Sequence, residues 1–396
     1  IGTFVFLISA NYWGVGFKNQ FLPTLLKIHA FTLPFSIMNL SLNSVLIHQS
    51  KVKELVVSSI LSNLLKIGLV IVSVQIFNSV LFVIISITFS QIVQFLANYF
   101  IAHIKFKTKL KTKLCLAQLK IGAPLGLSGL AGTALLYIDG FMISWFKDLK
   151  SYAIYRNGAI EVPFISTLYI SISTIVLPET ARLIKESKFK EIVRLKQSII
   201  TNTAMILYPI FIFLLFNYNE FITTYLGEKY QPSAIIFIIY SVSLLFRVND
   251  FHDIFIAKGK TKIVLFSYII GLLINILLNG ILIYHFDIVG AAIATIISLL
   301  CLLSFLFIKS ASLVNAKANE FIEFKKIFII LGVSILLSAL LSTLHLFDID
   351  SKLRLIVFAC IFFPIIYIFI IKSKLMSHKI LKSVLPNRLI QLLKID

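Results

Sequence analysis

The chain has 396 residues, of which 59% are hydrophobic and 14% charged, and its formal net charge is +20. A soluble domain is nearer to roughly 45–50% apolar and about 25% charged, so this composition excludes a water-soluble core. A charge this positive points to nucleic acid in a soluble protein. Here the basic residues flank apolar stretches, where they would meet anionic lipid head groups, so we expect no nucleic-acid partner. The three cysteines lie far apart, which argues against a disulfide framework or a cysteine metal site, and we expect no cofactor.

Apolar stretches joined by short connections run along the whole chain. Crossing the hydrocarbon takes about 20 helical residues, and about twelve stretches meet that length. We therefore predict an all-α, polytopic membrane helix bundle with about 12 spans. The predicted spans are a remnant at 1–12, then 24–47, 55–76, 80–104, 121–146, 154–177, 197–217, 233–256, 263–285, 288–308, 326–346 and 353–372.

The basic residues fall in alternate connections. One set of connections, together with the C-terminal tail, holds 27 of the 37 lysines and arginines, the other set holds 7, and 3 lie within spans. Cationic loops stay on the cytoplasmic side of a membrane. The pattern predicts a multi-pass protein of the bacterial cytoplasmic (inner) membrane with a cytoplasmic C-terminus. Two of these basic segments, 179–196 and 373–396, are amphipathic, and we expect both to lie along the membrane surface.

An internal repeat relates the two parts of the chain. A shift of 209 residues places Leu46–Lys51 on Phe255–Lys260, and the following spans end at Phe77-Asn78 and Phe286-Asp287. Both copies of the basic loop are on the same side, so the halves run in the same direction. Two spans of the second half have no partner in the first. We therefore expect about 14 spans in the natural protein, with the first two missing from this chain.

The repeat suggests how the chain is organised. We expect two six-helix halves followed by two further spans. The predicted parts are an N-terminal bundle lacking its first two spans at 1–104, a basic cytoplasmic linker at 105–120, a C-terminal bundle at 121–308, two additional spans at 309–372, and a basic cytoplasmic tail at 373–396.

Ionisable residues inside apolar spans are costly and are therefore functional candidates. Lys66 lies at the centre of its span without an acidic neighbour on that helix, which favours a position facing a watery cavity. Arg247 and Asp250 are one turn apart and are spaced to pair with each other, a structural alternative to a role in function. Asp139 and Glu161 lie in the outer halves of their spans. They are candidates both for ion pairs and for function.

Three stretches together resemble a known family. They are Pro124–Gly129 running to Asp139, Tyr152–Glu161 running to Glu179, and Ala257–Lys262 followed by Asn275, Asn279 and Gly290–Thr295. The chain resembles the polysaccharide transporters, of the O-antigen flippase (Wzx) type, in the multidrug/oligosaccharidyl-lipid/polysaccharide exporter superfamily. Arg156 and Glu161 depart from the apolar or small residues typical of that family at these positions.

The resemblance implies a transporter rather than an enzyme. It implies ion-coupled alternating access that moves an undecaprenyl-pyrophosphate-linked oligosaccharide between leaflets, with H⁺ or Na⁺ as the coupling cation. Membrane lipids and other polysaccharide-assembly membrane proteins are the expected partners. On this interpretation the substrate-binding residues are Lys66, Arg156, Arg247 and Asn275, and the ion-coupling residues are Asp139, Glu161 and Asp250.

Other functions stay open at this stage. A cation-coupled multidrug exporter of the same superfamily would favour a carboxylate-lined cavity, against which Lys66 and Arg247 argue. A lipid II flippase differs only in its cargo. A membrane polysaccharide polymerase or ligase would need a sizeable outside loop with polar catalytic groups, and the longest outside loop is about 218–232.

The predicted orientation is testable with two fusions to the C-terminus. A green fluorescent protein fusion is expected to fluoresce, and an alkaline phosphatase fusion is expected to be inactive, because the basic tail would stay in the cytoplasm. Active phosphatase at this end would contradict the assignment of the basic loops to the inside.

Overall fold

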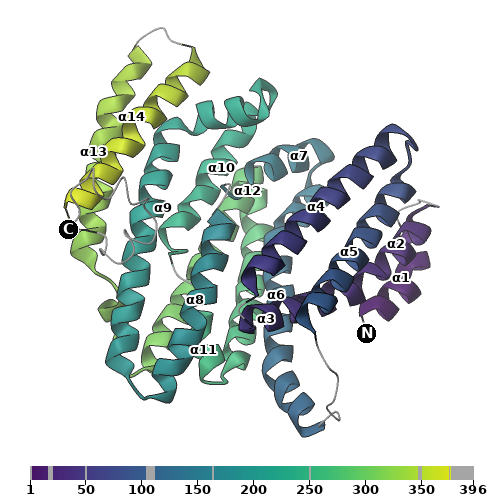
Figure 1. Cartoon of the computed structure of the whole chain (residues 1–396). Coiled ribbons are helices and arrows are strands. Elements are labelled where there is room, and N and C mark those ends of the chain that lie inside the picture. The colour runs from purple at the N-terminus through teal and green to yellow at the C-terminus, as the bar shows by residue number, and fades with distance from the viewer. Residues whose placement is uncertain are drawn as a thin grey trace. The chain divides into compact units, whose positions relative to one another are not determined.

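The computed structural model describes residues 2–16, 21–49, 51–103, 112–162, 165–248, 251–346, 350–373 and 375, and over these residues all regular structure is helical (Figure 1). The chain divides into two compact units, Ile1–Leu110 and Lys111–Asp396. In the part that is described, eight helices are long and apolar enough to cross a membrane. The predicted all-α polytopic bundle is confirmed, while the number of spans and the finer domain boundaries stay predictions.

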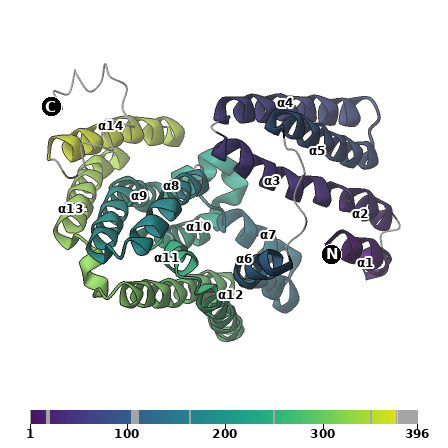
Figure 2. The same ribbon diagram turned by 60° about the horizontal axis from the view of Figure 1, so that its bottom comes forward.

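Five helices make up the described residues of the first unit, and α5 packs against both α3 and α4 (Figure 2). Helices α2 and α3 meet at Phe31, whose backbone angles remain helical, so that together they form the predicted span at 24–47. The bounds are α1 Gly2–Gly16, α2 Leu22–Ala30, α3 Thr32–His48, α4 Val52–Gln75 and α5 Val80–Ala102.

A buried amide ties three helices of the first unit together. Asn98 on α5 donates from Nδ2 to Oδ1 of Asn39 at 2.7 Å and of Asn43 at 3.1 Å, both on α3. Its own Oδ1 accepts from the hydroxyl of Ser58 on α4 at 2.5 Å. Lipid tails are as apolar as the helices, so interhelical hydrogen bonds and close packing of small residues hold such a bundle.

The second unit contains the remaining helices. Their bounds are α6 Thr112–Phe146, α7 Leu149–Gly158, α8 Ile165–Lys185, α9 Phe189–Leu226, η1 Glu228–Ser233, α10 Ala234–Ser241, η2 Val242–Leu245, α11 His252–Ala257, α12 Thr261–Leu313, η3 Ala318–Phe321, α13 Phe324–Leu341, η4 Ser342–Leu346 and α14 Ser351–Lys372. Helices α13 and α14 are the two additional C-terminal spans that the sequence predicts.

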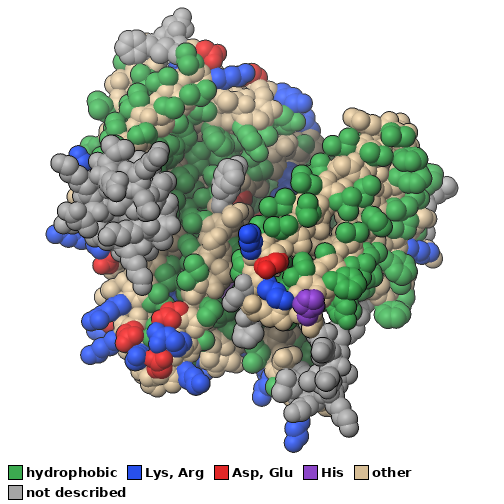
Figure 3. All heavy atoms as spheres, in the orientation of Figure 1, with side chains coloured by type: hydrophobic (Ala, Val, Ile, Leu, Met, Phe, Trp, Pro, Cys, Tyr) green, Lys and Arg blue, Asp and Glu red, His purple; other side chains and the backbone are tan. Residues whose placement is uncertain are grey.

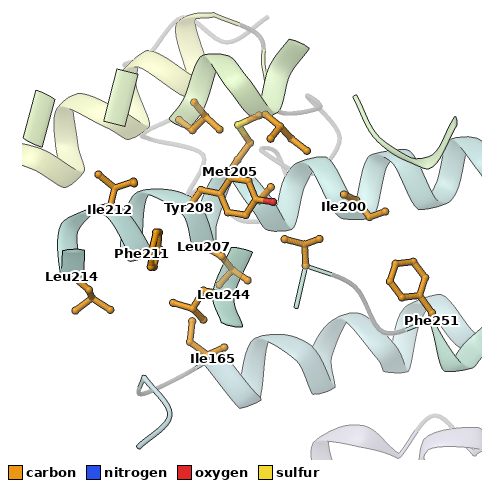
Figure 4. Packing of buried hydrophobic residues seen from close by; sticks show 14 of the residues in the cluster. Ile165, Ile200, Met205, Leu207, Tyr208, Phe211, Ile212, Leu214, Leu244 and Phe251 are labelled. Carbon is orange, nitrogen blue, oxygen red and sulfur yellow. The ribbon is translucent and has the colours of Figure 1, made fainter. Parts of the chain in front are cut away.

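Helix α9 forms the centre of the second unit. In its apolar window 72% of the residues are buried, against 28% in α13 and α14. It packs against α8, α10, α13 and α14. Figure 4 shows Tyr208 and Phe211 of α9 together with Leu244 of η2 and Ile165 of α8. The shorter helices of the second unit therefore pack around α9.

One ion pair of the second unit is fully enclosed. Nζ of Lys196 on α9 lies 2.6 Å from Oδ1 of Asp253 on α11, and the two side chains are 0% and 7% exposed. The hydroxyl of Thr180 on α8 donates to the other oxygen of Asp253, Oδ2, at 2.6 Å. The carboxylate therefore fastens the short helix α11 to α8 and α9.

Apolar side chains cover the outer faces of the helices, as expected where lipid replaces water. Figure 3 shows them over α4 and α5, where Leu61, Leu64 and Phe89 are among the exposed side chains. Charged side chains gather instead where α8 meets α9 (Figure 3), with Arg182 bridging Glu179 and Glu186. In the structure the segment 179–196 comprises the end of α8, which continues to Lys185, and the start of α9 at Phe189, and its place along the membrane surface stays a prediction.

The backbone has matching local geometry at two points of the predicted internal repeat. The amide of Lys51 donates to Leu46 O at 2.9 Å, and 209 residues later the amide of Lys260 donates to Phe255 O at 2.8 Å. The turn at the other end of the hairpin repeats as well, with φ of 45° at Asn78 and 54° at Asp287. Asn and Asp tolerate this left-handed conformation better than most residues. The shared geometry persists although few of the side chains are identical.

The same loop also makes the same contact in both units. Gln49 Nε2 donates to the carbonyl of Ala102 at the end of α5, at 3.1 Å. Lys258, 209 residues after Gln49, donates from Nζ to the carbonyl of Leu313 at the end of α12. Such donors satisfy carbonyls that a helix end leaves without a partner. Burial, and then the neighbouring Lys260, lowers the pKa of Lys258.

Two predicted spans differ from the structure, and two neighbouring ones agree with it. The predicted spans 263–285 and 288–308 are the two arms of α12, which are joined by a non-helical turn at Asp287. A Cβ on Gly290 would lie 2.0 Å from the carbonyl oxygen of Leu282, so the chain folds back tightly there, as the small residues of this stretch suggest. The predicted spans 154–177 and 233–256 are wrong as continuous helices, because each is broken near its middle.

The enclosed ion pair predicts a strong effect on stability. Lys196→Met leaves the Asp253 carboxylate buried without its cation, and we expect a loss of about 3–5 kcal/mol. Adding Asp253→Asn should recover most of that loss, because no isolated charge then remains. Thermal unfolding in detergent measures both, with Arg182→Gln in the exposed pairs as a control that stays near wild type. A single variant as stable as wild type would contradict the enclosed pair.

Candidate functional site

The first break in the second unit lies between α7 and α8. Helix α7 ends at Gly158, where a Cβ would lie 2.5 Å from the carbonyl oxygen of Ser233, so only glycine allows this approach of the chain to η1. Residues 159–162 are not helical. Pro163 follows in the sequence, and a residue before proline avoids the helical region. The break places Glu161 on non-helical backbone within an apolar span.

The second break follows η2. Arg247 and Val248 are not helical, and α11 begins only at His252. A broken helix within a membrane exposes carbonyls that must find other donors. The hydroxyl of Tyr208 on the central helix α9 donates to Leu245 O at 2.7 Å and supplies one of them. Discontinuous helices of this kind form the substrate and ion sites of many secondary transporters.

An ion pair joins the two breaks. Nη1 of Arg247 lies 3.1 Å from Oε1 of Glu161. The guanidinium carbon also lies 5.0 Å from the centre of the Tyr169 ring on α8, a cation–π distance. The suggested pairing of Arg247 with Asp250 assumed one helical turn between them; Arg247 lies outside any described helix and contacts Glu161, and a pair with Asp250 stays a prediction. Asp250 lies outside the described residues, and its ion-coupling role stays a prediction.

This ion pair borders a cavity of about 370 Å³, which we call the arginine cavity. Arg156 on α7 also lines it, with its guanidinium carbon 4.8 Å from the centre of the Tyr137 ring. The lining thus contains two guanidinium groups and one carboxylate. The side chains of Arg247 and Glu161 are 36% and 41% exposed.

A second cavity, of about 480 Å³, lies between α6, α11 and α12. Tyr268 and His252 line it, together with Ser128 and Thr133 of α6. We call it the Tyr268 cavity. Arg247 and Leu136 line both cavities.

Asp139 is fully buried and accepts hydrogen bonds on one oxygen from three hydroxyls. Oδ2 contacts the hydroxyls of Tyr155 on α7, of Tyr240 on α10 at 2.7 Å and of Thr295 on α12 at 2.7 Å. The two tyrosine oxygens are 2.6 Å apart. Nδ2 of Asn275 donates to Thr295 Oγ1 at 3.1 Å, which leaves the threonine hydrogen for Asp139.

The surroundings of this carboxyl group are uncharged. Its Oδ2 is enclosed by the hydroxyls of Tyr155, Tyr240 and Thr295. An isolated charge is costly in such a low-dielectric interior.

Two oxygen atoms of the same network are available for a ligand. In the part of the chain that is described, Asp139 Oδ1 and Asn279 Oδ1 are buried without a hydrogen-bond partner. Asn279 donates from Nδ2 to Asn275 Oδ1 at 2.9 Å, so the two atoms belong to one connected set of polar groups. Buried oxygens without a donor are unusual and suit a bound proton or cation.

The structure brings together some of the predicted site residues. Arg156, Glu161 and Arg247 line the arginine cavity, and Asp139 and Asn275 share one buried network. Asn275 was predicted to bind substrate, and its contacts favour a role beside Asp139.

Lys66, on α4 of the first unit, donates from Nζ to Asn63 Oδ1 at 2.9 Å. It lies 209 residues before Asn275, at the matching position of the repeat.

Sequence reasoning missed the hydroxyls around Asp139. Tyr155 and Tyr240 are 85 residues apart, and Thr295 is 156 residues from Asp139. Uncharged polar residues are common in membrane helices, and only the fold shows that these converge. The signal in the sequence was Asp139 alone, because a carboxylate in an apolar span requires partners.

The fold resembles that of a solved flippase. A structure of the lipid II flippase MurJ in an inward closed conformation superposes with a TM-score of 0.60 over 89% of this chain and 75% of that one, at 18% identity. At this identity the similarity establishes the fold.

A relative by sequence is the uncharacterized membrane protein MJ1068 of Methanocaldococcus jannaschii, which is 27% identical over 172 residues. The match covers 42% of this chain and about a third (34%) of that protein's length. It supports the assignment of this chain as a multi-pass membrane protein.

Residues 1–235 match the family described as polysaccharide biosynthesis protein. The matched region includes the whole first unit and, in the second, Asp139, Arg156 and Glu161. This confirms the resemblance drawn from the motifs. The chain therefore belongs to the polysaccharide biosynthesis protein family and is a multi-pass membrane protein.

Proposed function

We propose that the protein is a flippase that carries a polyprenyl-pyrophosphate-linked oligosaccharide, such as an O-antigen repeat unit, across the bacterial cytoplasmic membrane by ion-coupled alternating access. The observation that carries the proposal is the arginine cavity, where Arg156 and Arg247 lie beside two broken helices within a membrane bundle. A pyrophosphate needs cations at this depth, because water is not there to solvate it.

The two arginines suit a pyrophosphate in their geometry as well as in their charge. A planar guanidinium donates two parallel hydrogen bonds to a phosphate, and aromatic stacking restricts its orientation beforehand. Tyr137 and Tyr169 stack on Arg156 and Arg247 respectively. Glu161 then acts as the anion that holds Arg247 when no cargo is bound, and an arriving pyrophosphate displaces it.

Lys66 is the proposed cation of the first unit. It lies within the span α4, where an ammonium is costly unless it serves a ligand or a polar path. Asn63 holds its Nζ by one hydrogen bond of 2.9 Å, and an ammonium has three hydrogens to donate. The remaining donors suit a phosphate group.

Asp139 is the proposed coupling residue. H⁺ is the proposed ion, because a buried carboxyl group that is enclosed by uncharged hydroxyls is least costly when it is neutral. Loss of the proton leaves a buried negative charge among uncharged side chains, which favours a different arrangement of α6, α7, α10 and α12. The unpartnered Asp139 Oδ1 and Asn279 Oδ1 are the atoms that Na⁺ would use instead. Glu161 and Asp250 are the secondary candidates for coupling.

Two alternative cargoes share part of this chemistry. Lipid II also carries a pyrophosphate, and a flippase for it has the fold seen here. A multidrug exporter would usually bind cations, and the two guanidinium groups beside one carboxylate disfavour this. Further features of the proposal are a cytoplasmic C-terminus and contact with other polysaccharide-assembly membrane proteins.

The arginine cavity predicts how variants behave in cells. Arg247→Ala and Arg156→Ala each remove charged hydrogen bonds to phosphate worth about 1.5–3 kcal/mol, so transport should fall roughly 10- to 100-fold. Lys66→Ala should have a similar effect. The measurements are surface glycan and the amount of lipid-linked oligosaccharide in a deletion strain that carries each variant.

Lys229→Ala is the matched control, because it removes a cation at the surface, in η1. Immunoblots of membranes verify that every variant inserts. Wild-type glycan levels in both Arg156→Ala and Arg247→Ala would contradict the proposed pyrophosphate site.

Asp139→Asn tests the coupling. The neutral amide resembles a protonated carboxyl but cannot release a proton, so the variant should insert and bind cargo without responding to an ion gradient. Transport in proteoliposomes with an imposed proton or sodium gradient measures this. Asp148→Asn, at the exposed N-terminus of α7, should respond as wild type does. An Asp139→Asn protein that still responds to the wild-type gradient would remove Asp139 from the coupling mechanism.

A further inference from the structure

The Tyr268 cavity has no role in the pyrophosphate site proposed above. Its volume of about 480 Å³ is within the range of roughly 300–1,000 Å³ typical of small-molecule sites. Apolar side chains of α6 and α12 form most of its wall, and a few polar groups converge on it. This mixture is typical of a site that binds and orients a ligand with both apolar and polar surfaces.

We propose that this cavity binds the sugar that is attached directly to the pyrophosphate of the cargo. The inference rests on the proposed function and names a subsite for it. Arg247 and Leu136 line both cavities, so a group beside the Arg247 guanidinium can continue from one into the other. The first sugar is joined to the distal phosphate through a single oxygen atom. It therefore has to lie next to whatever holds that phosphate.

The aromatic side chains of the cavity suit a pyranose. Tyr268 and His252 lie with ring centres 5.7 Å apart and planes inclined by 33°. A pyranose ring has a face of C–H bonds that packs against such rings, and hydroxyls around its edge. An aromatic side chain with a polar end can contact both parts.

Hydroxyls of α6 can accept hydrogen bonds from the rim of the sugar. Ser128 donates its hydroxyl hydrogen to Leu125 O at 2.7 Å, and Thr133 donates its own to Gly129 O at 2.9 Å. Both hydroxyl oxygens keep lone pairs for a donor. Sugar hydroxyls are such donors, and the Arg247 guanidinium can donate to them in return. A lipid tail has no groups that could form these additional hydrogen bonds.

Gly132 sets the position of the Tyr268 ring. A Cβ on Gly132 would lie 2.9 Å from Tyr268 Cε1 and 3.2 Å from Cδ1, so an alanine there forces the ring to move. Gly126 lies on the same helix and has nothing within 4 Å of such a Cβ. The two glycines make a matched pair for testing whether the ring position governs sugar binding.

The test uses the full chain in lipid nanodiscs and three soluble probes. They are citronellyl pyrophosphate, and the same lipid carrying either N-acetylglucosamine or galactose on its distal phosphate. Titration calorimetry gives the Kd of each probe. For the wild type, at least one sugar-bearing probe should bind more tightly than the sugar-free one. Gly132→Ala and Tyr268→Leu should weaken that probe about tenfold and change the sugar-free probe less than about twofold. Gly126→Ala should bind like wild type.

Each result is decisive for one of the two proposals. Unchanged sugar binding in both Gly132→Ala and Tyr268→Leu would overturn the sugar site, as would equal weakening of all three probes. Equal affinity of the wild type for all three probes would overturn it as well. Arg247→Ala should weaken every probe, and failure of the wild type to bind any probe would instead reject the proposed pyrophosphate site and the sugar site with it.

Discussion

Backbone and charged groups inside a bilayer need partners within the protein. This constraint explains where the second unit places its two helix breaks and the charged residues beside them. A continuous helix satisfies its own backbone, whereas a broken one needs donors from its neighbours. Tyr208 supplies one donor to the carbonyl of Leu245, and the Arg247–Glu161 ion pair closes the gap between the two breaks. The well-packed helix α9 contacts η2, directly before the second break, and α8, directly after the first. Charged side chains and non-helical backbone would be unfavourable on an isolated helix in lipid. Here their contacts with neighbouring helices hold them beside the arginine cavity.

In the second unit, the cationic candidate residues and the buried acidic residue Asp139 lie in different places. The arginine cavity collects cationic groups that suit an anionic cargo, while the Asp139 network is an acidic group enclosed by hydroxyls. The Asp139 network and the arginine cavity share consecutive residues of α7, because Tyr155 belongs to the network and Arg156 lines the cavity. Tyr240, which contacts Asp139, also lines the arginine cavity. A change in the protonation of Asp139 can therefore alter the cavity through elements that the two sites share, which is what coupling requires.

The apolar spans, the repeat and the identity of most charged candidates could be predicted from the sequence, because length and hydropathy report helices that cross a membrane. The helix breaks after α7 and η2 could not be predicted in this way, because hydropathy averaged over a whole span does not reveal a few non-helical residues within it. Gly158 and Pro163 were signals for the first break. The pairing of Arg247 with Glu161 could not be predicted either, because spacing arguments assume a helix and Arg247 lies outside one. The partners of Asp139 come from α7, α10 and α12, and no local pattern predicts such a convergence.

The most direct test of the proposed function is the leaflet in which the cargo accumulates. The measurement labels lipid-linked oligosaccharide with a membrane-impermeant periodate–hydrazide reagent, in cells with the gene deleted and in cells with it restored. Our account predicts a complete lipid-linked unit that is protected from the reagent in the deletion strain and labelled after restoration. Equal labelling in the two strains would contradict the flippase and shift the assignment to another step in surface-polysaccharide assembly or to another cargo.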